Sequence, residues 1–169
     1  MGFGLPAAMG AQAAFPDALV VDIDGDGSFV MNIQELATVK CENLPVKVIV
    51  LNNGALSFVE LEMKADGIVN YGTDLDNPSF AKVAEAIGLF GVRIERPSEL
   101  DEGLRAGLAH DGPAVIEVMS ARQELSIPPN ITAEQTKGFT LWATRSVLSG
   151  RADEVIQVAK TNLRELAVE

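Results

Sequence analysis

The sequence predicts an α/β fold, with three α/β/α layers around a doubly wound, mainly parallel sheet and a C-terminal helical hairpin. Short apolar runs rich in β-branched residues alternate with longer stretches of helical periodicity. Such alternation requires right-handed crossovers between parallel strands. The runs also lack the polar alternation of half-exposed strands, so we expect them to be buried on both faces of the sheet.

Each element of this sheet has a local signal. The predicted strands are residues 19–24, 46–51, 92–95 and 114–119. The predicted helices between and around them are residues 5–15, 28–42, 56–65, 78–88 and 98–110. Pro6, Pro78 and Pro97 stand near helix starts, where the missing N–H of proline costs nothing. Asp101 and Glu102 place negative charge in a first helical turn, where the helix dipole favours it.

The pattern changes after Met119. Residues 126–130, with two consecutive prolines, read as a linker. Helices are predicted at 132–148 and 152–167, separated by Ser149 and Gly150. The second helix has a broad apolar face and a polar face of mixed charge, which favours packing on the protein over a membrane surface. We therefore predict an α/β domain at 1–125, followed by a linker and packed helices at 126–169.

Composition limits the function. The chain of 169 residues has 47% hydrophobic and 22% charged residues, as expected for a folded domain. Its net charge of −11 opposes binding to nucleic acid, and a phosphate ligand would need a bridging cation. No apolar run approaches the roughly 18 residues of a membrane span. The single cysteine, Cys41, is predicted to be a small buried apolar residue and fits a reducing cytoplasm.

Residues 20–29 carry the clearest chemical signal, because aspartates at 22, 24 and 26 alternate with glycines at the end of a strand. Ligands of α/β sheets bind at that edge. One interpretation is a calcium loop, but its twelfth position, which should be glutamate, is Ile33. Another is a haloacid-dehalogenase-like phosphatase with Asp22 as nucleophile and Asp24 as acid/base. No later acidic pair follows a strand, since residues 92–95 lead into Arg96 and Pro97.

A third interpretation uses two strand ends. Asp26 follows the first strand, and Asn53 follows the second after one intervening helix. Adjacent parallel strands would place these side chains side by side, and their oxygens suit Mg²⁺. Phosphate oxygens could then bind the cation and the free N–H groups of the helix starting near Ser28, with Gly27 allowing close approach of the backbone. A dinucleotide fingerprint is excluded, because Val30 stands where its third glycine belongs.

Gly25-Asp26-Gly27 followed by Asn52-Asn53 resembles the diphosphate-anchoring motif of thiamine diphosphate (ThDP) enzymes. Two further segments resemble acetolactate synthases: Gly2-Phe3-Gly4-Leu5-Pro6-Ala7-Ala8, and Ser28-Phe29-x-Met31-Asn32-x-Gln34-Glu35-Leu36. Others resemble pyruvate oxidase, the quinone-linked pyruvate dehydrogenase: Phe58-Val59-x-x-Glu62-Met63-Lys64, Glu124-Leu125-x-Ile127-Pro128-Pro129, Lys137-Gly138-Phe139, Ser149-Gly150-Arg151 and Lys160-Thr161-Asn162. The resemblance covers essentially the whole chain and implies the C-terminal, diphosphate-binding domain of these enzymes.

The resemblance implies roles for individual residues. Asp26, the Asn53 side chain and the backbone carbonyl of Ala55 would ligate Mg²⁺. The cofactor diphosphate would lie against residues 25–28, with Gly25, Gly27 and Ser28 beside Asp26. Three more positions are implied: Met1 falls where acetolactate synthases carry the apolar residue that bends the cofactor, and Phe58 and Glu62 match pyruvate oxidase positions on the substrate side.

The implied chemistry is decarboxylation of a 2-oxo acid such as pyruvate, with ThDP as electron sink. In the family, a glutamate of a separate pyrimidine-binding domain activates the cofactor, and pyruvate oxidase holds FAD in a middle domain. Neither domain is expected in this chain, so we assign no catalytic residue and expect no FAD. The chain then resembles a fragment that begins inside a domain, which needs a pyrimidine-binding domain or partner subunit as its partner. With apolar residues at 1–15 and 19–24 exposed, a homo-oligomer is expected. The alternative is a non-catalytic binding or association module.

Three aromatic or titratable positions are expected to have no catalytic role. His110, the only histidine, precedes the turn signal Asp111-Gly112-Pro113 and is predicted to be a solvated loop residue. Phe139 and Trp142 have helical spacing and are predicted to form core or domain contacts.

Overall fold

The computed structural model describes residues 1–122 and 132–165, with side chains as far as residue 162. The chain forms two compact units, one of residues 1–54 and 76–120, the other of residues 55–75 and 121–169. We describe each unit by itself. The predicted domain boundary at residue 125 and the linker at 126–130 lie outside the described residues. The predicted packing of the last helices on the α/β domain stays a prediction.

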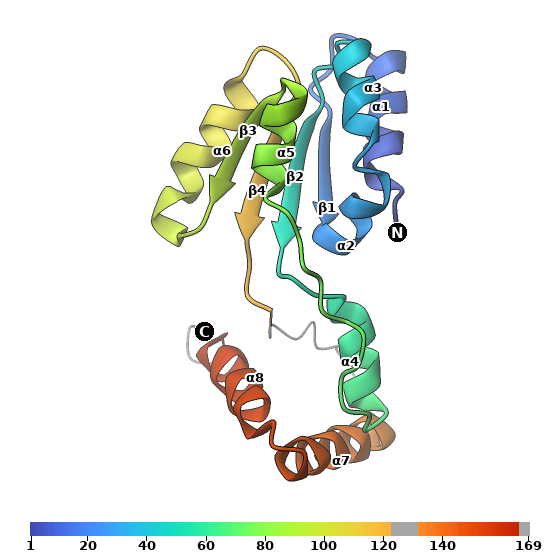
Figure 1. The fold of residues 1–169 in the computed structure, drawn as a ribbon, viewed down its shortest axis with the longest axis vertical. Coiled ribbons are helices and arrows are strands. Elements are labelled where there is room, and N and C mark those ends of the chain that lie inside the picture. Colours follow the sequence, from blue (N-terminus) through green and yellow to red (C-terminus); the bar gives the residue numbers. More distant parts are fainter. Residues whose placement is uncertain (123–131, 166–169) are drawn as a thin grey trace. The chain divides into compact units, whose positions relative to one another are not determined.

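The first unit contains a four-stranded parallel sheet (Figure 1). Its strands are β1 (Val21–Gly25), β2 (Lys47–Asn52), β3 (Phe90–Ile94) and β4 (Ala114–Met119), in the order β1-β2-β4-β3. All neighbouring pairs are parallel. Each strand overlaps a predicted one, which confirms the α/β fold class. The third begins earlier than predicted, because Phe90 and Gly91 already pair with Ala114 and Val115.

Five helices accompany this sheet among the described residues: α1 (Gly4–Ala14), α2 (Asp26–Phe29), α3 (Glu35–Cys41), α5 (Phe80–Ile87) and α6 (Leu100–Ala109). The prediction of one helix over 28–42 is wrong. A 3₁₀ turn at Val30–Asn32 separates α2 from α3. The Asn32 side chain donates to the carbonyl of Gly2, so this break ties the helical segment to the start of the chain.

Helices cover both faces of the sheet. On one face α1, α3 and α5 enclose the main core, in which the rings of Phe29 and Phe80 meet edge to face at 5.3 Å. Gly91 permits the close approach of α5, because a Cβ there would lie 2.2 Å from the carbonyl oxygen of Ala81. On the opposite face α6 packs on β3 and β4. This arrangement has the predicted three layers and supports the edge where β1 and β2 end.

Burial of β1 departs from the prediction. Val21 and Ile23 are 40% and 68% exposed, and Leu19 and Leu51 are exposed as well. These side chains remain exposed because β1 is an edge strand and α6 covers β3 and β4 instead. Burial on both faces holds for the central part of the sheet, where Val48, Val50 and Ile116 are inaccessible. Cys41, predicted to be buried, is exposed because it is the last residue of α3.

The second unit is helical in its described residues. It contains α4 (Ser57–Ala65), α7 (Ala133–Leu148) and α8 (Ala152–Glu165). Helix α7 packs on α4, and α8 packs on α7. The Thr132 hydroxyl caps α7 by accepting from the N–H of Gln135. Trp142 is 2% exposed, with the Lys64 Nζ 5.4 Å from its ring centre, which confirms that Trp142 is a core residue.

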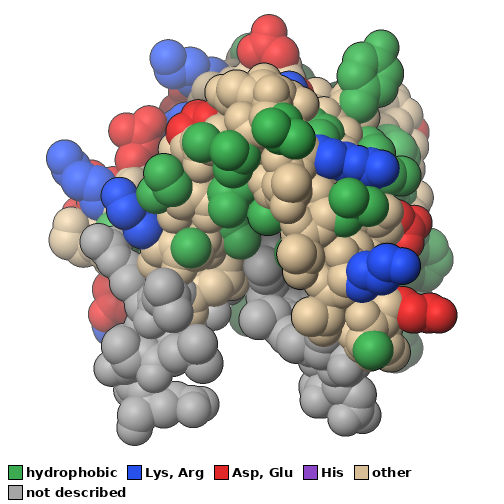
Figure 2. All heavy atoms as spheres, turned by 90° about the horizontal axis from the view of Figure 1, so that it is seen from below, with side chains coloured by type: hydrophobic (Ala, Val, Ile, Leu, Met, Phe, Trp, Pro, Cys, Tyr) green, Lys and Arg blue, Asp and Glu red, His purple; other side chains and the backbone are tan. Residues whose placement is uncertain are grey.

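Large apolar side chains also reach the surface of the second unit. Leu141, Val147 and Leu148 of α7 and Ile156 of α8 are exposed. Figure 2 shows hydrophobic side chains at the surface among Lys, Arg, Asp and Glu, so charges of both signs interrupt the apolar area. None of the helices in the described part of the chain is long and apolar enough to cross a membrane.

Candidate functional site

The carboxyl ends of β1 and β2 bring the predicted diphosphate-binding residues together. Gly25 pairs with Leu51 at the end of the β1–β2 ladder. Asp26 follows directly as the first residue of α2, and Asn53 follows the last residue of β2. Asp26 is only 3% exposed. The parallel register therefore juxtaposes the two segments, as the sequence predicted.

Three N–H donors hold the Asp26 carboxylate. Its Oδ1 accepts from the Gly27 N–H at 2.9 Å. Its Oδ2 accepts from the Gly54 N–H at 2.8 Å and from Asn77 Nδ2 at 2.7 Å. Gly54 has φ +70°, a conformation that favours glycine and turns its N–H toward the carboxylate. The acid is thus ordered before any cation arrives.

Asn52 and Asn77 also belong to this site, although the Asn52-Asn53 motif assigned no role to Asn52 and nothing in the sequence indicated Asn77. Asn52 is buried, and its Oδ1 accepts from the Gly54 N–H at 3.2 Å and from Asn77 Nδ2 at 3.1 Å. Its Nδ2 donates to Glu117 Oε1 at 2.8 Å. Asn77 comes from the segment that precedes α5. Only the tertiary fold reveals its role, because no spacing rule links it to Asp26.

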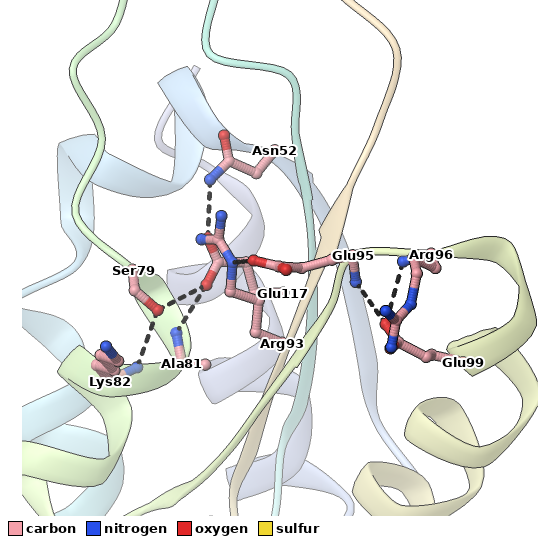
Figure 3. A network of polar contacts seen from close by, with 9 residues as sticks. All are labelled: Asn52, Ser79, Ala81, Lys82, Arg93, Glu95, Arg96, Glu99 and Glu117. Atoms are coloured by element: carbon pink, nitrogen blue, oxygen red, sulfur yellow. Dashed lines mark hydrogen bonds and ion pairs between the residues drawn. The ribbon is translucent and has the colours of Figure 1, made fainter.

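Glu117 ends this chain of contacts inside the sheet (Figure 3). It is 0% exposed, and its carboxylate accepts from Arg93 Nη1 at 2.6 Å, from Ser79 Oγ at 3.1 Å and from the Ala81 N–H at 3.2 Å. Arg93 stands opposite Glu117 in the β3–β4 register. The signal available in the sequence was a lone carboxylate within an otherwise apolar strand, which needs a buried partner.

The start of the chain lies against the same loop. The Gly2 N–H donates to Ser28 Oγ at 2.9 Å, and Asn32 donates to the Gly2 carbonyl. Ser28 can still donate its own hydroxyl proton. Met1 is therefore held beside the predicted diphosphate-binding loop with 70% of its surface exposed.

The other predicted positions belong to the second unit. Ala55 is 4% exposed and forms an isolated antiparallel bridge with Asp74. Phe58, which is 74% exposed, and Glu62, which is exposed, lie one turn apart on α4. The placement of these three residues toward Asp26 stays a prediction.

Glu60 is the buried acid of α4. It accepts from Thr73 Oγ1 at 3.0 Å, from Lys64 Nζ at 3.2 Å and from Arg122. Burial alone would raise the pKa of Glu60, but the hydrogen bond from Arg122, the charge of Lys64 and the bonds from Thr73 and Lys64 outweigh it and lower the pKa. Arg122 also pairs with Asp74. Through its ion pairs with Glu60 and Asp74, Arg122 joins the loop after α4 to that helix.

Asp22 is buried and Asp24 is half-buried, with one oxygen of each enclosed beside Gly4 of α1. Asp22 is 6% exposed and lies against Gly4, where a Cβ would come within 2.4 Å of its Oδ1. The Oδ2 atoms of both aspartates are buried without a hydrogen-bond partner. Burial, followed by the charge of Asp24, raises the pKa of Asp22 to about 6. At 6% exposure, Asp22 is inaccessible to a phosphate substrate, which disfavours the phosphatase interpretation.

Two simpler expectations can also be compared with the structure. No cluster of three Asp, Glu, His or Cys side chains suited to a metal occurs within the described residues. His110 is exposed at the end of α6 and stacks on Phe90, with ring centres 4.8 Å apart, which confirms its assignment as a solvated loop residue.

Comparisons with known proteins agree with this geometry. A family profile described as "Thiamine pyrophosphate enzyme, C-terminal TPP binding domain" matches residues 1–118. Acetolactate synthase 3, chloroplastic, of Brassica napus is 45% identical in an alignment 137 residues long that covers 76% of this chain and 21% of that protein. The mitochondrial acetolactate synthase catalytic subunit of Aspergillus candidus is 45% identical over 129 residues, covering 76% of this chain and 19% of that protein.

A solved structure shows the same likeness. The thiamine diphosphate-dependent 4-hydroxybenzoylformate decarboxylase of Rhodococcus jostii RHA1 superposes with a TM-score of 0.67 and 34% sequence identity, over 72% of this chain and 23% of that chain. The chain spans about a fifth of the length of the curated relatives it matches. By the family match, the sequence similarity and the shared fold, the chain belongs to the C-terminal, ThDP-binding domain family of thiamine diphosphate-dependent enzymes.

Proposed function

We propose that this chain binds the diphosphate of ThDP through Mg²⁺ at the carboxyl edge of β1 and β2, as part of an enzyme that decarboxylates a 2-oxo acid. The observation that carries the proposal is the Asp26 carboxylate, which three N–H donors hold at the strand end next to Asn53. Carboxylate and amide oxygens are the ligands that Mg²⁺ prefers, and the cation would offset the charge of −11 toward phosphate.

The donor set fits such a cation. Asp26 Oδ1 accepts one hydrogen bond, which leaves it a further acceptor position. We assign Asp26, the Asn53 side chain and the Ala55 carbonyl as the protein ligands of Mg²⁺. Gly25, Gly27 and Ser28 would hold the diphosphate, and Met1 would contact the body of the cofactor. Phe58 and Glu62 are proposed on the substrate side.

ThDP, when bound, supplies a nucleophilic carbon and an electron sink for decarboxylation. The residues of this chain would anchor and orient the diphosphate end, so that the reactive end is presented in a fixed position. Pyruvate is the substrate that we propose within this class. We further propose that a pyrimidine-binding domain, in the same or a partner polypeptide, supplies the acid that activates the cofactor. Assembly into a homo-oligomer would cover the exposed apolar side chains of β1.

Calorimetric titration of the 169-residue chain with ThDP tests the proposal. In Mg²⁺ we expect saturable binding that EDTA abolishes. Asp26→Ala should weaken the Mg²⁺-dependent affinity at least about 100-fold, because it removes the charged ligand, whereas loss of an outer partner costs about 10- to 100-fold.

Asp17→Ala is the matched control, because Asp17 is exposed in the turn after α1 and the change in net charge is the same. It should leave binding unaltered. Absence of binding up to millimolar ThDP would contradict the proposal and favour an association module. Equal binding with Mg²⁺ and EDTA would contradict the cation bridge.

A further inference from the structure

We propose that Asn77 is a positioning residue that orients the Asp26 carboxylate. Asn52 and Glu117, on the side away from Asp26, determine that the Asn77 amide turns its Nδ2 group toward this carboxylate. The expected effect of Asn77 on Mg²⁺ affinity rests on the proposed function. The orientation of Asp26 in the cofactor-free protein does not, because it follows from the hydrogen bonds between these four side chains.

Glu117, at the buried end of this series of hydrogen bonds, determines which group of each amide donates and which accepts. The Glu117 carboxylate accepts from Arg93, Ser79 and the Ala81 N–H, as well as from Asn52. A carboxylate in this state is acceptor-only, so the Asn52 amide must turn its Nδ2 toward Glu117. Asn52 Oδ1 is then obliged to face the opposite way, toward Asn77 and Gly54.

The same logic orients Asn77. Two acceptors, Asn52 Oδ1 at 3.1 Å and Asp26 Oδ2 at 2.7 Å, meet its amide. Only the Nδ2 group can satisfy both, because it carries two protons. With the amide reversed, Asn77 Oδ1 would face the acceptor oxygens of Asp26 and Asn52 with no proton between them, which is repulsive. Glu117 at one end and Asp26 at the other therefore leave Asn77 a single favourable orientation.

This orientation has a consequence for Asp26. Oδ2 accepts two hydrogen bonds, from Asn77 and Gly54, and both of its lone pairs are occupied. Oδ1 accepts one, from the Gly27 N–H. The remaining acceptor position of the carboxylate is therefore on Oδ1, and we assign this position to the cation. Without Asn77 the carboxylate can rotate, and the cation must order it on binding.

Glu117 ties this orientation to rigid structure. It lies in β4 and is 0% exposed, and its partner Arg93 lies on the neighbouring strand β3. Ser79 and the Ala81 N–H, at the start of α5, donate to the same carboxylate, and both residues follow closely after Asn77 in the sequence. The segment carrying Asn77 is thus held at the site by the acid that also fixes Asn52.

The test compares Asn77→Ala with Asn43→Gly. Asn43 is exposed and has φ 49°, so glycine suits that position and an amide is lost from the surface only. In the cofactor-free chain, NMR hydrogen exchange at the Gly54 amide should accelerate about tenfold in Asn77→Ala, because the acceptors of this N–H lose their shared donor. Asn43→Gly should exchange as the unmodified protein does.

The second readout is the affinity for ThDP in Mg²⁺ and in EDTA. Asn77→Ala should weaken Mg²⁺-dependent binding about tenfold, the effect of losing one hydrogen bond to a charged group, and leave any metal-free binding unchanged. Asn77→Ser, which keeps a shorter donor, should recover part of the loss. A residue with only a structural role would instead lower both affinities together with the unfolding midpoint.

The outcomes separate the two proposals. Unchanged Gly54 exchange and unchanged Mg²⁺ dependence in Asn77→Ala would overturn the positioning role and leave Mg²⁺–ThDP binding intact. If the unmodified chain shows no Mg²⁺-dependent binding, the proposed function fails, and Gly54 exchange alone still decides whether Asn77 orders Asp26. Accelerated exchange confined to Asn77→Ala supports the inference in either case.

Discussion

Gly138→Ala is expected to disrupt the helical unit, although alanine is the better helix former. An ideal Cβ at position 138 would lie 1.5 Å from the Ala65 carbonyl oxygen and 2.5 Å from its carbon. Both atoms are backbone, so α7 has to move away from α4. We expect a loss of about 3 kcal/mol in the stability of this unit, at the upper end of overpacking effects.

Fluorescence of the single tryptophan measures this effect, because Trp142 is buried in the second unit and follows Gly138 by one turn of α7. Its urea transition should shift to lower concentration. Gly10→Ala is the matched control, since a Cβ there meets nothing within 4 Å. That change should stabilise α1 by up to about 1 kcal/mol. An unaltered Trp142 transition in Gly138→Ala would show that the α4–α7 contact is not as close as described.

Asp22→Asn is expected to stabilise the first unit above pH 6 and to change how stability depends on pH. The pKa of Asp22 is raised from 3.8 to about 6, by burial first and by the charge of Asp24 second. Between these values the folded protein binds more protons than the unfolded chain, so the free energy of unfolding falls as pH rises. The cost of ionising Asp22 is fully present above pH 6 and is relieved as the pH falls toward 4.

A neutral asparagine removes this cost, because it carries no charge to bury. The expected gain is up to about 3 kcal/mol at pH 7.5, declining to near zero at about pH 4. Urea unfolding followed by far-UV circular dichroism over this range measures it. Asp17→Asn, with the same change in charge at an exposed site, should show no such pH-dependent gain. A variant that is less stable than the unmodified protein at pH 7.5 would refute the account of Asp22.

Much of the fold follows from local patterns. The apolar runs at 46–51 and 114–119 predict β2 and β4 well, because interior strands must satisfy only packing and ladder hydrogen bonds. The exposed face of β1 was missed, since a run of residues does not reveal its neighbours in the sheet. The break between α2 and α3 depends on the distant contact of Asn32 with Gly2, which no helical periodicity records.

The site divides in the same way. The positions of Asp26 and Asn53 are predictable because parallel strands end at the same edge of a sheet. Residues that follow two adjacent strands are therefore expected at that edge. Asn77 and Glu117 are not predictable, because their roles depend on the strand order and on the path of the chain before α5. The pattern Glu60-x-Glu62 predicts that both acids are solvated, which is wrong for Glu60, because residues two positions apart in α4 lie on opposite sides of the helix.

Paramagnetic NMR with Mn²⁺ in place of Mg²⁺ tests the central claim most directly, because it locates the cation without relying on activity. With ThDP present, substoichiometric Mn²⁺ should first broaden the amide resonances of residues 25–28 and 52–54, at the ends of β1 and β2. Asp26→Ala should abolish this broadening. Broadening centred on another acidic region, such as the first turn of α6, or identical broadening without ThDP, would contradict the claim that this edge binds the metal–diphosphate group.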